Sequence, residues 1–418
     1  MVKEKTTTIK LFKVLKYLWL VFSFIIIIWK GVIPGSKKVN TDFNNYYTAS
    51  KLVLEGKSIH KFYNNDWFYK QAQNLGIKSG AKFSPFPPIT AYAYIPLTIW
   101  KPLTAKRIWL LINIFILIIV PFRIRKISDW SLNKSILFLS LFTIPLASSL
   151  YQGQLYLIIG FILLETIRQI YTKKKKFPIG SVIGVAASLK YIPILFLGYI
   201  IRSQKKTTIL LSAFLAIIIP SLFIYWKDNQ AYSSFFQHFQ SHIQGNLPGQ
   251  GKYAINFQSI DSLLNNLFIY GSIKNPFPII NASILKPIIK YSLFAGIVSF
   301  LFLLFKKNKF QTTPLFVSIC IIGIFIMLPA SASYHFFLLL FPLLNIFMWL
   351  KNLNSKKTIG IVAIIVLTTF SLQAHHIPNF EKFPTINLLL HYPRFWGLLC
   401  LFLVLSLHYN NYLSKNYG

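Results

Sequence analysis

The chain has 418 residues, of which 54% are apolar, 17% are aromatic and only 13% are charged. A soluble domain usually carries about twice that charged fraction, so the composition excludes an ordinary soluble protein. Lys and Arg outnumber Asp and Glu by 44 to 9, but they form short clusters between apolar runs. This arrangement is typical of membrane proteins and disfavours a nucleic-acid partner.

Long apolar runs predict an all-α, multi-span transmembrane protein with about 10–13 membrane segments. Residues 18–33, 108–122, 209–226 and 291–305 each approach the ~20 residues needed to cross the hydrocarbon core, and further runs follow. The whole chain, residues 1–418, is expected to form one integral membrane domain. The N-terminal run has no small-residue cleavage site, so it is interpreted as a retained first span.

Clusters of Lys and Arg set the expected topology, because cytoplasmic loops are enriched in these residues. Basic residues precede the first span and place the N-terminus inside. Later clusters alternate with polar loops that are expected outside, at about residues 35–83, 227–278 and 373–391. Roughly ten full crossings fit this alternation.

Two apolar segments depart from simple spans. Residues 83–100 contain four prolines, which disfavour a straight helix, so this segment is expected to dip into the membrane or lie at its edge. Residues 177–201 are interrupted by Lys190 and are expected to form a hairpin that turns near it. Broken elements of this kind are tolerated at membrane depth where they line a cavity.

The polar residues that interrupt apolar segments all fall at the outer side on this topology, opposite the basic clusters. They are Asp42, Gln152, Gln154, Lys190, Asn256, Gln258 and His335. The two sets of residues were identified independently. Their separation therefore favours a single site that faces outward.

Asp42 begins a predicted amphipathic helix that lies at the interface in the first outer loop. Phe43, Tyr46 and Tyr47 follow helical spacing, and Gly56 is suited to end the helix. One interpretation of Asp42 is an N-cap, which is a common use of Asp. The other is a general base that takes a proton from a hydroxyl acceptor. The local sequence alone favours the cap.

Lys190 has about a dozen mostly apolar residues on each side. An ammonium near the bilayer midplane costs about 3 kcal/mol or more unless it is paired or lies in a polar cavity. A phosphate group would be a suitable partner. The alternative is a lysine at the end of a helix whose boundaries differ from those predicted, but the general rule for intramembrane charges favours a functional residue.

Amide and imidazole side chains complete the candidate binding residues, which are Gln152, Gln154, Asn256, Gln258 and His335. Amides both donate and accept hydrogen bonds, which suits sugar hydroxyls. Polar turns contain the same residue types, however, and a single His at a helix start is more often structural than catalytic. The local sequence does not separate these alternatives.

Other chemistries lack their signatures. The sequence has no P-loop, no nucleotide-binding Gly-rich turn after a strand and no paired acidic motif, which disfavours a soluble type of nucleotide-sugar enzyme. His375 and His376 are adjacent and do not have zinc-ligand spacing. Glu165 and Arg168 are three residues apart on one predicted helix and are expected to pair. Neither a metal nor a cofactor is expected.

Six short elements follow one another along nearly the whole chain. They are Asp-Phe-x-x-Tyr-Tyr-x-Ala (42–49), a Pro-rich run (84–88), Gly-Gln (153–154), a Gly-rich apolar segment that ends at Lys190, Asn-x-Gln-Ser (256–259) and an element from Ser to His (331–335). In this order they resemble glycosyltransferase family 87, multi-span enzymes of the GT-C class that use polyprenyl-phosphate-mannose. Each element alone is weak, and their order carries the resemblance.

The resemblance implies an inverting single displacement that moves a hexose, mannose by analogy, from a polyprenyl-phosphate carrier to a hydroxyl acceptor. Asp42 would match the family's base, and Lys190 would bind the phosphate. Tyr46, Tyr47, the glutamines, Asn256 and His335 would lie around donor and acceptor. The implied partners are the donor, a lipid or glycan acceptor and membrane lipids. The site would face outward from a bacterial plasma membrane.

Some positions depart from the family pattern and leave the sugar and the acceptor open. Leu155 follows Gly-Gln where Asn is frequent, Tyr191 follows Lys190 where Pro is frequent, and a single His335 stands where paired His is frequent. A flippase for lipid-linked sugars is the alternative function, and it predicts transport without a new glycosidic bond. A non-catalytic membrane scaffold is a third interpretation.

Overall fold

The computed structural model describes residues 2–78, 81–172, 178–200, 206–245, 251–273, 275–276, 278–309, 311, 313–378 and 383–417. The regular elements of this part of the chain are all helical, apart from one isolated bridge between Gly271 and Asn275. The predicted all-α class is therefore confirmed.

Six helical segments of the described chain are long and apolar enough to cross a membrane. They are α1–η1–α2 (Val2–Ile26, Ile27–Val32, Ile33–Lys37), α5 (Pro102–Ser128), α6–η5–α7 (Leu132–Leu139, Ser140–Phe142, Thr143–Gln152), α10 (Lys206–Lys227), α13 (Leu285–Lys307) and η8–α15 (Ser333–Leu339, Leu340–Asn352). The bent pair α17 (Pro384–Leu390) and α18 (Pro393–Tyr417) would make a seventh. The chain is an integral, multi-pass membrane protein.

The remaining apolar segments are shorter or broken, so fewer segments than the roughly ten crossings expected from the basic clusters are long enough to span. They are α8 (Tyr156–Thr172), α9 (Ile179–Leu189), η6 (Ile192–Ile200), α14 (Pro314–Met327) and α16 (Lys356–Ser371). Lys190 is extended, at φ −150° and ψ 121°, between α9 and η6, which confirms the predicted break. The Pro-rich segment forms two 3₁₀ turns, η3 (Pro88–Tyr92) and η4 (Ile95–Ile99), and no straight helix.

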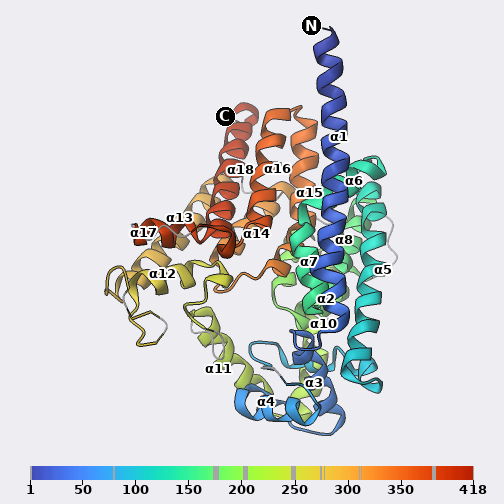
Figure 1. Cartoon of the computed structure of the whole chain (residues 1–418), viewed down its shortest axis with the longest axis vertical. Helices are drawn as coiled ribbons and strands as arrows, with labels where there is room; N and C mark the ends of the chain where they lie inside the picture. Colours follow the sequence, from blue (N-terminus) through green and yellow to red (C-terminus); the bar gives the residue numbers. More distant parts are fainter. Residues whose placement is uncertain are drawn as a thin grey trace.

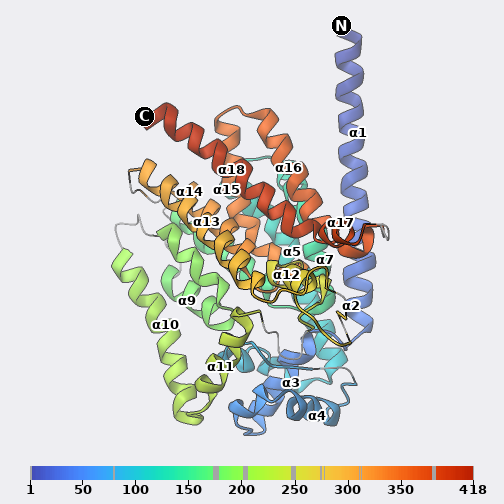
Figure 2. The same cartoon turned by 90° about the vertical axis from the view of Figure 1, so that its left-hand side faces the viewer.

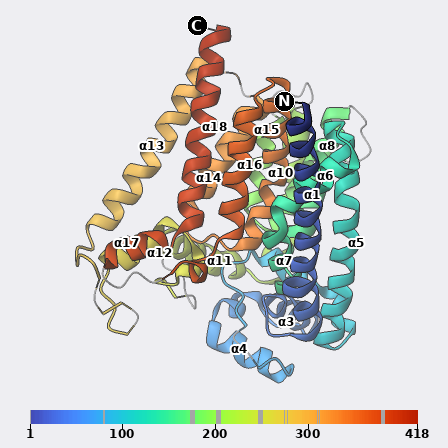
Figure 3. The ribbon, with the colours of Figure 1, turned by 45° about the horizontal axis from the view of Figure 1, so that its top comes forward.

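The two ends of the molecule hold different parts of the chain. Both termini and the α5–α6 and α15–α16 connections lie at the upper end in Figure 1, whereas α3 (Phe43–Leu54) and α4 (Asn65–Asn74) lie at the lower end. The basic residues that close α5 and α15 are therefore far from the first outer loop. Figure 3 shows the same separation from another side, with α16 beside α18.

A glycine in α9 permits the close packing that fixes the position of Lys190. A Cβ at Gly184 would come within 2.4 Å of the Ala213 carbonyl oxygen on α10, so no larger residue fits at this spacing. Small residues let neighbouring membrane helices approach in this way. Figure 2 shows α9 lying along α10. The tight pairing holds the C-terminal end of α9 at one depth.

The polar loops fold over the lower part of the bundle. The first contains α3, η2 (Ile59–Tyr63) and α4, and the second contains α11 (Ala231–Ile243), η7 (Ile255–Phe257) and α12 (Ile260–Phe268). The short turn η9 (Ala374–His376) follows α16. Every side chain from Phe43 to Ser50 is buried, so the first half of α3 is enclosed by protein instead of presenting one face to water.

Candidate active site

Asp42 occupies the N-cap position of α3, but its side chain does not cap the helix. Its Oδ2 atom accepts hydrogen bonds from Gln154 Nε2 at 2.6 Å and from the Tyr334 hydroxyl at 3.0 Å. No described residue donates to the other carboxylate oxygen, Oδ1. The carboxylate is therefore held by two neutral donors on one side and faces cavities on the other.

A buried lysine of α5 fixes the loop that leads to Asp42. Lys106 Nζ donates to the Lys38 carbonyl oxygen at 2.5 Å and to Thr41 Oγ1 at 2.7 Å, and the whole Lys106 residue is inaccessible to solvent. The Asp42 backbone N–H donates to Gln152 Oε1 at 3.2 Å. These contacts tie the start of α3 to α5 and α7.

Gln154 is oriented by a tyrosine behind it. The Tyr46 hydroxyl donates to Gln154 Oε1, which leaves Nε2 to donate to Asp42. Burial raises the pKa of Tyr46 well above its usual range, so the hydroxyl keeps its proton. Gly153 turns the chain at φ +66°, and a Cβ there would come within 2.9 Å of Phe43 Cβ. Glycine at this position lets the end of α7 pack against α3.

Unlike some other acids of the described chain, Asp42 lacks a cationic partner: no described Lys or Arg nitrogen lies within ion-pairing distance of its carboxylate. Three others are paired: Glu165 with Arg168, Asp228 with His60, and Asp261 with Lys290. The first of these pairs was predicted from the sequence. An unpaired carboxylate at a cavity is free to interact with a substrate.

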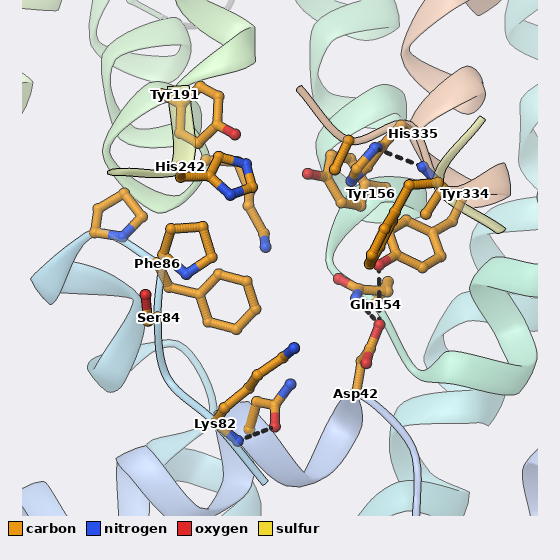
Figure 4. A pocket seen from close by; sticks show the side chains of 17 residues that line it. Asp42, Lys82, Ser84, Phe86, Gln154, Tyr156, Tyr191, His242, Tyr334 and His335 are labelled. Carbon is orange, nitrogen blue, oxygen red and sulfur yellow. Dashed lines mark hydrogen bonds between the residues drawn. The ribbon is translucent and has the colours of Figure 1, made fainter. Parts of the chain in front are cut away.

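A small cavity of about 80 Å³, the inner pocket, lies between α3, the Pro-rich segment, the start of α8, the end of α9 and η8. Figure 4 shows two walls that face each other across it. One wall carries Lys82, Phe86 and His242, and the other carries Asp42, Gln154, Tyr334 and His335. The pocket thus has cationic and acidic sides.

Lys190 lines the inner pocket and is enclosed by aromatic rings. Its Nζ lies 3.6 Å from the centroid of Phe86 and 5.2 Å from those of Tyr46 and Tyr156. The residue is 4% exposed, and no described carboxylate forms an ion pair with it. Ring faces attract a cation but do not accept its hydrogen bonds as an anion would. The ammonium is therefore well placed to bind an anionic group.

Lys82 lines both cavities and was not singled out from the sequence. Its backbone N–H donates to Asn45 Oδ1 at 2.9 Å. Burial lowers the pKa of Lys82 to about 8, and Asp42 partly opposes this shift. Burial, with further contributions from Lys82 and Lys190, lowers the pKa of His242 to about 4. His242 is therefore neutral near pH 7.

His335 lines the inner pocket but also has a structural role. Its Nδ1 accepts the Ala332 backbone N–H at 3.2 Å at the start of η8. Its ring packs edge-on against Tyr156 and Tyr334, with centroids 4.8 Å apart in each case. His335 therefore shapes the pocket wall while it caps a turn.

A larger cavity of about 710 Å³, the outer cavity, adjoins the inner pocket and shares Asp42, Lys82 and Tyr334 with it. Gln152 and Asn256, both predicted from the sequence, line the outer cavity and not the inner pocket. Asp42 therefore lies at the junction of two spaces of different size.

Like Tyr46, which lines neither cavity, two further predicted binding residues use their polar atoms within the protein. The Tyr47 hydroxyl donates to the Trp100 carbonyl oxygen at 2.8 Å, and the residue lines neither cavity. Gln258 lines the outer cavity, but its Nε2 donates to two backbone carbonyls and its Oε1 accepts the Arg394 backbone N–H. The geometry favours positioning roles for both.

An apolar groove of about 480 Å³ runs between α8 and α9. Its lining extends along α8 from Leu155 to Gln169 and along α9 from Ser181 to Leu189. Leu155 and Leu189 directly adjoin Gln154 and Lys190 in the sequence, so one end of the groove lies beside the inner pocket.

Several site residues were missed because tertiary packing alone brings them together. Phe86, Tyr156 and His242 have no distinctive sequence context, and Lys82 is one of many lysines. Tyr334 is an exception. It directly precedes His335 in the short element at residues 331–335, so the sequence did contain a signal for it.

Comparison with known proteins connects this geometry to a family. The sequence pattern of Glycosyltransferase family 87 matches residues 85–332, more than half of the chain. The match contains Gln154 and Lys190 but not Asp42, which the fold brings to them. No curated protein and no solved structure matches the chain significantly. The chain belongs to glycosyltransferase family 87 and is a membrane glycosyltransferase.

Proposed function

We propose that the protein transfers a hexose, mannose by analogy with the family, from a polyprenyl-phosphate carrier to a hydroxyl acceptor by an inverting single displacement. One observation carries this proposal: the unpaired Asp42 carboxylate lies where the inner pocket meets the outer cavity. A donor in one space and an acceptor in the other would meet at this carboxylate. Such a position suits a general base.

The inner pocket has the chemistry expected of a sugar-phosphate site. Lys190 supplies a buried ammonium without a carboxylate partner among the described residues, and Lys82 adds a second cation to the pocket lining. Gln154 and Tyr334 offer polar groups near Asp42. Amides and hydroxyls of this kind suit sugar hydroxyls.

The apolar groove supports a lipid-linked donor. From Leu155 to Gln169 an α-helix rises about 20 Å, enough for several isoprene units. The groove begins beside Gln154 and Lys190, so a carrier chain in it would bring its phosphate to the inner pocket. A water-soluble nucleotide sugar would have no use for such a groove.

The reaction follows from these positions. Asp42 Oδ1 takes the proton of the acceptor hydroxyl as that oxygen attacks the anomeric carbon. The new glycosidic C–O bond forms while the bond from the anomeric carbon to the phosphate oxygen breaks. The carrier phosphate departs with the electron pair, and Lys190 and Lys82 stabilise its charge. Attack opposite the leaving group inverts the anomeric configuration.

The charge distribution supports a site on the outer face of a bacterial plasma membrane. The basic connections after α5 and α15 lie at the end of the molecule that also carries both termini, away from α3. Cytoplasmic loops are enriched in Lys and Arg, so the α3 end would be external. Membership in a transferase family favours catalysis over the flippase alternative.

The test uses purified protein in lipid, polyprenyl-phosphate-mannose labelled in the sugar, and a lipid extract from the source membranes. We expect the label to leave the carrier and to appear in a new product with inverted anomeric configuration by NMR. The matched glucosyl carrier tests the choice of sugar. Label that crosses the bilayer while still attached to its carrier would overturn the proposal in favour of a flippase.

A further inference from the structure

We propose that the outer cavity binds an acceptor that carries an anionic group, a phosphate or a carboxylate, and that Arg394 is its main contact. This inference rests on the proposed function, because it identifies the acceptor class for the same site. The cavity walls that carry it belong to η1, η9 and the start of α18.

Arg394 is a buried cation without an anionic partner among the described residues. It is 3% exposed and lines the outer cavity near the N-terminus of α18. Its Nε donates to the Leu372 carbonyl oxygen at 3.1 Å, and Phe336 lies 5.9 Å from its guanidinium carbon. Nη2 has no hydrogen-bond partner among the described residues. Burying a charge without a partner is costly, so an anion in the cavity would satisfy this guanidinium.

The rest of the cavity wall is also basic. Lys30, Lys82 and His375 line it, and Asp42 is the one carboxylate among its lining residues. Lys30 is exposed and lies in the π-helical turn η1, an irregular type of turn that often marks functional sites. An acceptor could thus present its anionic group to Arg394 and Lys30.

Neutral polar residues also line the outer cavity. They are Ser148, Gln152, Asn256, Ser333 and Gln373. These hydroxyl and amide groups suit a polyhydroxylated acceptor. The acceptor class is therefore a hydroxyl-bearing molecule with one anionic group, either a lipid headgroup or a soluble sugar phosphate.

A binding measurement tests the site without any reaction. Purified protein is titrated with fluorescent phosphatidylglycerol and, separately, with fluorescent phosphatidylcholine. The protein carries a net charge of +35, so some anionic lipid binds everywhere, and the comparison between variants is the readout. We expect Arg394→Gln to weaken binding of phosphatidylglycerol about 10- to 100-fold and to leave binding of phosphatidylcholine unchanged.

Two further variants make this result interpretable. Arg125→Gln makes the same chemical change at an exposed site at the end of α5 and should have no effect. Lys30→Gln should weaken binding of phosphatidylglycerol less strongly than Arg394→Gln does. Because Lys30 is exposed, this variant should fold, and it tests the proposal if Arg394→Gln does not fold. Equal binding of both lipids, or equal binding by a folded Arg394→Gln or Lys30→Gln protein and the natural one, would overturn the proposal.

One experiment distinguishes a lipid from a soluble source of the anion. A second experiment distinguishes failure of this inference from failure of the proposed function. Glycerol phosphate that displaces the fluorescent lipid indicates a soluble ligand, whereas lack of displacement indicates a lipid headgroup. In the transfer assay, source lipids are divided by anion exchange into neutral and acidic fractions, and the label should enter the acidic one. Label in the neutral fraction would overturn the inference. Absence of any transfer would count against the proposed function, and the binding measurement alone would then test the inference.

Discussion

Asp42 and Asp261 both begin short helices that follow polar loops, and both lie near lysines, but their surroundings differ. Asp261 is 1% exposed, and Lys290 Nζ lies 2.8 Å from its Oδ2. Lys286 Nζ lies 3.5 Å from its Oδ1. Asp42 instead receives hydrogen bonds from two neutral side chains and borders two cavities. The comparison suggests that Asp261 stabilises the fold and that Asp42 is available for chemistry.

The largest expected effect separates these two carboxylates. Asp42→Asn keeps the shape of the side chain but removes the base, so we expect transfer to fall about 10²- to 10⁴-fold. The folded protein should remain, because no ion pair is lost. Transfer from the labelled carrier and a thermal melt measure the two quantities on one preparation.

Asp261→Asn is the control, and the opposite outcome is expected for it. It leaves Lys290 buried without its partner, which should lower the free energy of unfolding by about 3–5 kcal/mol. Transfer per folded molecule should change little. Loss of transfer in a well-folded Asp261→Asn protein, or full transfer by Asp42→Asn, would reverse the assignment of the two residues.

A second prediction concerns the unpaired ammonium of the inner pocket. Lys190→Met removes the proposed contact to the donor phosphate, so the KM for the donor should rise about 10- to 100-fold. Stability should not fall, because an apolar side chain replaces a buried charge. Lys61→Met, at an exposed position that lines neither cavity, should leave KM unchanged. An unchanged KM in Lys190→Met would place the phosphate elsewhere.

A third prediction uses pH. Burial lowers the pKa of Lys82 to about 8, so its positive charge is present below this pH and is lost as pH rises through it. If that charge assists the donor, kcat/KM should decline above about pH 8, up to tenfold per pH unit. Lys82→Arg should move the decline to higher pH. A decline that stays in place in this variant belongs to another group, and Lys190 is the other ammonium in the pocket.

The smallest expected effect distinguishes two tyrosines. Tyr334→Phe removes one of the two hydrogen bonds to Asp42, so transfer should fall about 3- to 10-fold. Tyr47→Phe removes a bond to the Trp100 carbonyl that lies outside both cavities, so transfer should change by less than about twofold. Equal effects of the two changes would show that the Tyr334 hydroxyl does not act through Asp42.

The sequence predicted the helical class and the break at Lys190 because hydropathy and proline placement are local properties. In the described chain six segments, or seven with the bent pair, are long and apolar enough to span, while α9 and α14 are apolar but shorter. The sequence also predicted a half-exposed α3, because a periodic pattern cannot reveal that the Pro-rich segment covers the polar face.

The structure brings four of the predicted site residues together at the inner pocket, and their roles stay predictions. The four residues are Asp42, Gln154, Lys190 and His335, of which the last three stand beside apolar runs in the sequence. Tyr46 lies behind Gln154. The basic wall of the outer cavity could not be predicted, because Arg394 and its neighbours are ordinary residues in sequence that only the folded chain brings together.

The hydrogen bonds around Asp42 also determine where its proton can go after a turnover. Tyr46 donates to the Gln154 carbonyl oxygen, and Gln154 and Tyr334 each donate to Asp42 Oδ2. Every link points toward the carboxylate, so in this arrangement both neighbours act as donors to it. Under the proposed mechanism, the proton that Asp42 gains leaves by way of Oδ1 into the cavities, along with water or product. Regeneration of the enzyme is therefore coupled to the opening of the same space that admits the acceptor.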